Sequence, residues 1–301
     1  MSKPFKEMAT SPWATIIQAG AITSLLAYNF FTEASFHPII LYMVWIMLLV
    51  IIFAQAVDYQ NLSKLAGFEA PYPGFNFFMI VFGIGFGGLL FGLISYRAMQ
   101  MFSGGFTIFG LQVTGDMVYS MARPLYVPLS SAKEGVMFAM TGGVPIIILQ
   151  AWVGFTEELQ KLFHFKNLTN WLSSKGLKMD IASLFAFIGA NMIFGLMHFF
   201  AYNGEIMSLL MAVVFGMAFW STYFIPDYTN ILTPDKPMEW QGVLLSGSVA
   251  AHATWNYLIY SGMPLELNQF IIVCIALMGI SSTVMFLISR GHFDFIRVTY
   301  E

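Results

Sequence analysis

Long apolar stretches recur along this chain of 301 residues, and they constrain its fold more than any other feature. A helix that crosses a bilayer needs about 20 mostly apolar residues, since each residue adds roughly 1.5 Å of length. Windows of that kind occur at residues 13–32, 37–57, 75–96, 135–156, 180–201, 204–225, 240–261 and 267–289. The sequence therefore predicts an all-α, polytopic membrane protein, a bundle of about eight transmembrane helices.

The composition agrees with this prediction. Hydrophobic residues make up 58% of the chain and charged residues only 10%, whereas a soluble domain carries about 25% charged residues. No repeat, low-complexity tract or linker interrupts the pattern, so we expect a single integral membrane domain over residues 1–301 with the lipid bilayer as its first partner. The lysines and arginines form no basic run, which argues against nucleic acid as a partner. Cys274 is the only cysteine and can form no intrachain disulfide.

The distribution of positive charge predicts the orientation, because cytoplasmic loops are enriched in Lys and Arg. With the N-terminus inside, the inside segments hold Lys3, Lys6, Lys64, Lys161, Lys166, Lys175, Lys178, Lys236, Arg290 and Arg297. The outside segments hold only Arg97, Arg123 and Lys133. Both termini are therefore expected in the cytoplasm. This count of Lys and Arg does not decide the side of the membrane to which a site near His198 opens.

A glycine-rich segment, Gly83-Ile-Gly85-Phe-Gly87-Gly88, resembles a dinucleotide-binding fingerprint. It lies inside an apolar window, and no strand is predicted before it. Small residues four apart let helix backbones approach closely in membranes. We therefore interpret these glycines as a helix-packing surface rather than as a phosphate-binding loop.

Ionisable and amide side chains interrupt the later apolar windows, and they are the candidate catalytic residues. They are Glu157, Glu158, His198, His252 and Asn256. An ionisable side chain at membrane depth costs roughly 2.5–3.5 kcal/mol on insertion scales, so such residues commonly mark a function. For Glu158 the alternative is an ion-paired neighbour of the site. The remaining histidines, His37, His164 and His292, lie near the edges of spans or loops and are interpreted as structural or interfacial.

The spacing of Glu157 and His198 predicts that they meet. A helix is expected to begin near Pro145, to turn at residues 173–176 and to return from about Asp180. The midpoint between Glu157 and His198 lies beside Gly176, so in an antiparallel hairpin they lie at the same depth, each about 30 Å along its arm. The two side chains can therefore face each other.

This set of side chains suits hydrolysis. A carboxylate and a neutral imidazole together can deprotonate a water molecule, and the imidazole can then protonate a leaving amine. His252 and Asn256 are four residues apart, so they share one helix face. Side chains of these two types can donate hydrogen bonds to the oxyanion of a tetrahedral intermediate.

The ordered motifs Glu157-Glu158, Phe194-x-x-x-His198 and His252-x-x-x-Asn256 resemble those of the CPBP family. These proteins are the CAAX prenyl endopeptidases and their bacteriocin-processing relatives, also called intramembrane glutamic proteases. The resemblance covers about residues 145–260. It implies that the first glutamate and His198 activate water, that His252 and Asn256 support the oxyanion, that no cofactor is needed, and that the substrate is a peptide or protein at the membrane.

One position departs from the family pattern, which is Glu-Glu-x-x-x-Arg in its first motif. The arginine position is Leu162 here, although Lys161 can supply a cation one residue earlier. An alternative function is therefore a catalytically silent family member, acting as a scaffold, an immunity factor or an accessory subunit of a membrane complex. A zinc hydrolase with Glu157, His198 and His252 as ligands is a third hypothesis, and a transporter is a fourth.

Overall fold

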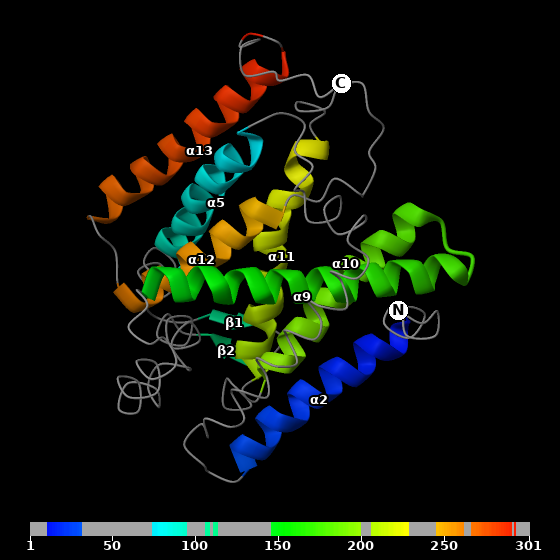
Figure 1. Cartoon of the computed structure of the whole chain (residues 1–301). Helices are drawn as coiled ribbons and strands as arrows, with labels where there is room; N and C mark the ends of the chain where they lie inside the picture. Colours follow the sequence, from blue (N-terminus) through cyan, green and yellow to red (C-terminus); the bar gives the residue numbers. More distant parts are fainter. Residues whose placement is uncertain are drawn as a thin grey trace. The chain divides into compact units, whose positions relative to one another are not determined.

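A computed structural model of the chain describes residues 11–31, 74–94, 106–108, 111–113, 146–199, 206–228, 245–261, 266–290 and 292. The described residues form seven helices (Figure 1): α2 (Pro12–Phe31), α5 (Phe75–Phe91), α9 (Ile146–Ser174), α10 (Met179–His198), α11 (Ile206–Tyr228), α12 (Leu245–Ser261) and α13 (Leu267–Ser289). Two strands of three residues, β1 (Phe106–Ile108) and β2 (Leu111–Val113), pair antiparallel with Phe106 opposite Val113. The described fold is thus helical, with one short strand pair, which aromatic and β-branched residues favour.

Three of the described helical segments are long and apolar enough to cross a membrane: Phe75–Ile94, Ile181–His198 and Leu267–Ile288. They indicate a membrane protein. Seven of the eight predicted windows overlap a described helix closely or in part, and α13 coincides with the window at 267–289. The window at 37–57 and the first part of that at 135–156 lie outside the described residues. The full set of eight spans therefore stays a prediction.

The chain divides into two compact units. Unit 1 comprises Met1–Tyr59, Met121–Val144 and Thr156–Ala218, and unit 2 comprises Gln60–Ser120, Pro145–Phe155 and Phe219–Glu301. The single membrane domain predicted for residues 1–301 stays a prediction.

In unit 2, α5 packs against both α12 and α13 (Figure 1). The glycines of α5 make this packing close. A side chain at Gly83 or Gly87 would collide with the backbone of α12, and one at Gly88 would press on the sulfur of Cys274 in α13. Gly154, in the first part of α9, similarly admits the backbone of α12 at Ala253. The interpretation of these α5 glycines as a packing surface is confirmed.

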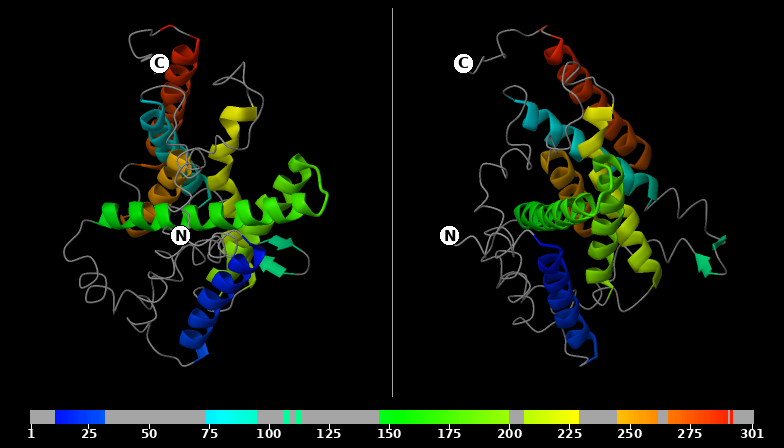
Figure 2. Two further views of the ribbon diagram at one scale, coloured as in Figure 1. Left: turned by 45° about the vertical axis from the view of Figure 1, so that its right-hand side comes forward. Right: turned by 90° about the vertical axis from the view of Figure 1, so that its right-hand side faces the viewer.

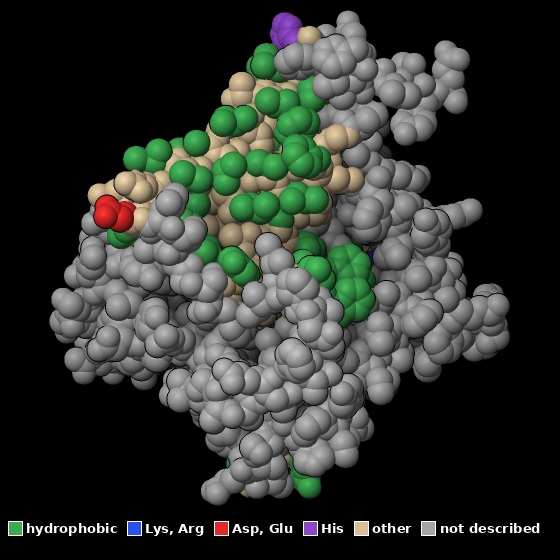
Figure 3. Space-filling view, turned by 60° about the vertical axis from the view of Figure 1, so that its left-hand side comes forward, with side chains coloured by type: hydrophobic (Ala, Val, Ile, Leu, Met, Phe, Trp, Pro, Cys, Tyr) green, Lys and Arg blue, Asp and Glu red, His purple; other side chains and the backbone are tan. Residues whose placement is uncertain are grey.

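The outer face of α13 is apolar. Its large side chains Ile272, Ile275 and Ile280 are exposed, and Figure 3 shows hydrophobic side chains along this face of the described residues. Exposed charged residues, Glu266 and Arg290, flank the apolar segment at its two ends. A segment of 22 residues spans about 33 Å as a helix, which matches the hydrocarbon thickness of a bilayer.

In unit 1, the chain reverses between α9 and α10 (Figure 2). Gly176 has φ of 94°, a left-handed conformation that glycine adopts without strain. The amide of Gly176 donates to the carbonyl of Ser173, and the amide of Leu177 donates to that of Leu172. This pattern is a Schellman motif, which ends α9 and turns the chain. The predicted turn at residues 173–176 is therefore confirmed.

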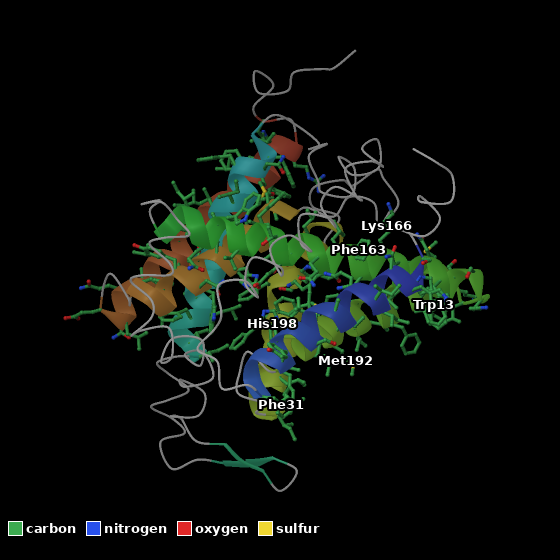
Figure 4. The ribbon with its side chains drawn as sticks, turned by 60° about the horizontal axis from the view of Figure 1, so that its bottom comes forward. Trp13, Phe31, Phe163, Lys166, Met192 and His198 are labelled. Atoms are coloured by element: carbon green, nitrogen blue, oxygen red, sulfur yellow. The ribbon has the colours of Figure 1, made fainter. Side chains whose placement is uncertain are left out.

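Helix α2 packs along this hairpin. Its residues Ile22 and Leu26 form a buried cluster with Met197 of α10. Nearer the start of α2, the amide nitrogen of Asn167 donates to the hydroxyl of Thr15 at 3.4 Å. In Figure 4, Trp13 lies toward the Lys166 end of this arrangement and Phe31 toward the His198 end. Helix α2 therefore runs antiparallel to α9.

Candidate functional site

Glu157 and His198 face each other across the α9–α10 hairpin in unit 1. The distance from His198 Nε2 to Glu157 Oε1 is 3.6 Å, and the two side chains are 17% and 21% exposed, respectively. This proximity is the one that the spacing around Gly176 predicts, and it is confirmed. Both side chains are partly exposed.

The tautomer of His198 follows from its second ring nitrogen. Nδ1 lies 2.8 Å from the carbonyl oxygen of Phe194, one helical turn earlier. A carbonyl can only accept, so Nδ1 carries the hydrogen and donates it. In the neutral imidazole, Nε2 therefore presents its lone pair toward Glu157. An ionised carboxylate and this nitrogen are both acceptors, and the 3.6 Å between them is longer than a hydrogen bond.

Glu158 has a different partner from Glu157. Its Oε1 lies 2.7 Å from Nζ of Lys161, and both side chains are completely buried. Lys161 Nζ also lies 5.0 Å from the ring centroid of Phe194 and 3.4 Å from the carbonyl oxygen of Gly216. Of the two roles predicted for Glu158, this geometry matches the ion-paired neighbour.

Phe194 contacts both Lys161 of the ion pair and His198. Its ring centroid lies 4.3 Å from that of His198, while its face receives Lys161. Leu162, which stands at the family's arginine position, is 1% exposed and belongs to the core. The cation beside the glutamates is therefore supplied from position 161, and its direct ion pair is with Glu158 rather than Glu157.

His252 and Asn256 lie on α12 in unit 2, one helical turn apart as predicted. The ring of His252 is 5% exposed and stacks on Phe219, with centroids 4.9 Å apart and ring planes 19° apart. Trp255 packs edge-on against the same Phe219. These aromatic contacts hold the imidazole in one orientation. The convergence of His252 and Asn256 with Glu157 and His198 stays a prediction.

Sequence reasoning missed part of the polar interior of unit 1. His164, interpreted as structural or interfacial, is completely buried, and so is Asn191. The signal for His164 was its spacing of three residues from both Lys161 and Asn167, which places all three on neighbouring positions of one helix face. Among the described residues, no group of three His, Cys, Asp or Glu side chains is close enough to hold a metal ion.

Comparisons with protein-family models, with curated proteins and with solved structures give no match for this chain. The function is therefore inferred from the geometry within each unit and from the order of the motifs.

Proposed function

We propose that this chain is an integral membrane endopeptidase that resembles the CPBP family, in which Glu157 and His198 activate the hydrolytic water. The observation that carries the proposal is the facing pair itself: a carboxylate 3.6 Å from the imidazole nitrogen whose lone pair points toward it. Once the two acceptors separate to roughly 4.5 Å, one water molecule can donate one hydrogen to Glu157 and the other to His198. Such a water is held and polarised by two bases at once.

The chemical step follows from this arrangement. As the water oxygen bonds to the scissile carbonyl carbon, one of its O–H bonds breaks and the proton passes to His198, while Glu157 stabilises the imidazolium that forms. When the C–N bond breaks, the same proton passes from His198 to the leaving amine. The products are a carboxylic acid and an amine, and no other reactant is required. Substrate is a peptide or protein that reaches the pair at the membrane.

In this proposal His252 and Asn256 donate hydrogen bonds to the oxyanion of the intermediate. Support comes from their shared face of α12 and from the stacking that fixes His252 on Phe219. The proposal requires both side chains to reach the same carbonyl that Glu157 and His198 attack.

In this proposal Lys161 neutralises one of the two adjacent glutamates. Two adjacent carboxylates in a low-dielectric interior repel each other strongly. Because Lys161 neutralises Glu158 at 2.7 Å, the partly exposed Glu157 is the carboxylate that faces His198. The lysine thus supplies, one residue earlier, the positive charge that Leu162 cannot.

The topology that we propose with this function has about eight transmembrane helices and both termini in the cytoplasm. The three described segments able to cross a membrane and the uneven distribution of Lys and Arg support it.

A second candidate is a catalytically silent relative that serves as a scaffold, immunity factor or accessory subunit. The core position of Leu162 favours it, because the family arginine is replaced by an aliphatic side chain that cannot pair with an acid. Glu157 and His198 would then be a structural pair.

The two candidates differ in whether new peptide termini appear. We suggest comparing the amino termini of membrane proteins in cells that make the wild type, Glu157→Gln, His198→Gln or Glu266→Gln. Glu266 is an exposed acid at the start of α13 and serves as the matched control. A peptidase gives one set of termini with the wild type and the control that is missing with the other two. Identical sets from all four proteins would favour the silent relative.

A further inference from the structure

Among the described residues of unit 1, five polar side chains are buried without a hydrogen-bond partner for at least one polar atom, and Gln18, His164 and Asn191 are three of them. Among the described residues, unpartnered atoms include both amide atoms of Gln18, both ring nitrogens of His164 and Oδ1 of Asn191. Gln18 is 8% exposed, and the other two side chains are completely buried. Leaving such groups unpaired in an interior is costly, so a cluster of them points to a ligand that pairs with them.

The contacts of the α9–α10 hairpin place His164 opposite Asn191. Glu157 meets His198, and four residues further along α9 Lys161 meets Phe194, four residues earlier in α10. His164 follows Lys161 by three residues in α9, and Asn191 precedes Phe194 by three residues in α10. The same register therefore places His164 and Asn191 at one level. Beyond them, Leu168 packs against Gly189, so contacts on both sides enclose this level.

The unpartnered oxygen of Asn191 lies against helix α11. Its amide nitrogen donates to the carbonyl of Phe187 at 2.8 Å, within its own helix. Its Oδ1 lies beside Gly216, where a side chain would collide with it. The glycine therefore lets the amide oxygen approach the backbone of α11 closely.

Helix α2 brings Gln18 to the same level. Thr15 meets Asn167, and α2 runs antiparallel to α9, as the packing of Ile22 and Leu26 on Met197 shows. Met197 in turn accepts a hydrogen bond from Gln160, further back along α9. Gln18 is one turn after Thr15, and His164 is one turn before Asn167. Their side chains therefore stand at one level of the three-helix arrangement.

We propose that Gln18, His164 and Asn191 form a binding site for internal water. The three groups are uncharged amides and an imidazole, and together they offer donors and acceptors without a carboxylate. A buried water molecule typically makes about three hydrogen bonds to such groups. His164 lies two helical turns, roughly 10 Å, from Glu157 on the same helix. If the proposed peptidase function holds, the site stores water beside the pair that consumes it.

Radiolytic labelling tests the site without any turnover. Hydroxyl radicals formed from bound water by a brief X-ray pulse oxidise the side chains next to that water, even where bulk solvent does not reach. The full chain in lipid nanodiscs is the sample. Met79 is the reference, because it is 1% exposed and lies in an apolar cluster of unit 2. The proposal predicts faster oxidation of His164 than of Met79, although a thioether is the more reactive group. Oxidation of His164 at or below the Met79 rate would overturn it.

Variants of the site sharpen the test. Gln18→Leu and Asn191→Leu each remove polar partners and should lower His164 oxidation several-fold. Ser281→Ala is the matched control, because its buried hydroxyl donates only within its own helix, at 2.7 Å to Leu277 and 3.1 Å to Met278. Unchanged labelling in both leucine variants would contradict the proposal. Glu157→Gln should retain the labelling, so loss of the peptidase proposal and loss of the water site are separate outcomes.

Discussion

The two units of this molecule bury different kinds of side chain. In unit 2, glycines bring α5 against α12 and α13, and described buried hydroxyls such as Thr222 and Ser281 donate to carbonyls of their own helices. In unit 1, the α9–α10 hairpin buries an ion pair, Glu158–Lys161, and polar groups that contact one another across helices. Among the described residues, the close backbone packing of α5 lies in unit 2 and the buried ion pair lies in unit 1.

This difference identifies where chemistry is expected. Close packing of backbones needs small residues and stabilises the fold directly. A buried ion pair is weak support for stability, since desolvation offsets most of the attraction. The buried ion pair lies beside a facing carboxylate and imidazole. In our proposal it serves the reaction of these two groups rather than the stability of the fold.

The largest expected effect concerns activity in unit 1. Glu157→Ala and His198→Ala should each abolish nearly all turnover, because the two groups act together on one water. The double variant should be little worse than either single variant, since groups that act as a unit are strongly non-additive. Turnover of a membrane peptide substrate measures this. Independent, multiplicative losses in the double variant would show that the pair does not act as a unit.

The next effect is on stability. Lys161→Met leaves the buried carboxylate of Glu158 without its partner, and breaking a buried pair costs about 3–5 kcal/mol. The double variant Lys161→Met, Glu158→Leu removes both charges and should recover most of that loss. Unfolding in mixed detergent micelles measures both values. A loss below about 1 kcal/mol for Lys161→Met, the scale of an exposed pair, would contradict the buried arrangement.

A smaller effect on rate is expected in unit 2. His252→Ala or Asn256→Ala should each reduce turnover roughly 10²–10³-fold, the scale of one lost oxyanion donor. Thr254→Val, on the same helix between them, is the control and should retain activity. If both alanine variants turn over substrate at the wild-type rate, α12 does not supply the oxyanion site.

The smallest effect tests the packing of unit 2. Gly87→Ala places a methyl group against the backbone of Ala251 and should destabilise the fold by about 1–3 kcal/mol through overpacking. Gly279→Ala, in α13, meets nothing within 4 Å and should be neutral or slightly stabilising, because alanine favours helix by about 1 kcal/mol. Equal unfolding free energies for the two variants would show that α5 and α12 are not in close contact.

The sequence predicts the hairpin well because a small number of local signals determine where it turns and which residues face each other. Gly176 ends α9, and a helix has a fixed rise, so the level at which Glu157 meets His198 follows from counting. The packing role of Gly83 and Gly87 follows from their spacing of four. These features depend on one or two elements at a time.

Other features depend on three elements and could not be predicted in the same way. On helical spacing alone, Lys161 can reach either glutamate. In the structure its ammonium group pairs with Glu158 and also contacts the carbonyl of Gly216 and the ring of Phe194. The level shared by His164, Asn191 and Gln18 requires the register of α2 against α9, which no motif encodes. The approach of His252 and Asn256 to the facing pair likewise depends on tertiary packing and stays a prediction.

The central claim is that Glu157 and His198 add water to a peptide bond, and isotope incorporation tests it most directly. The purified full chain in lipid vesicles is incubated with a pool of membrane-derived peptides in water enriched in ¹⁸O, and the new carboxyl termini are analysed by mass spectrometry. The proposal predicts ¹⁸O in termini produced by the wild type and by Glu266→Gln, and none from Glu157→Gln. No labelled termini from folded wild type, or equal labelling from Glu157→Gln, would contradict it.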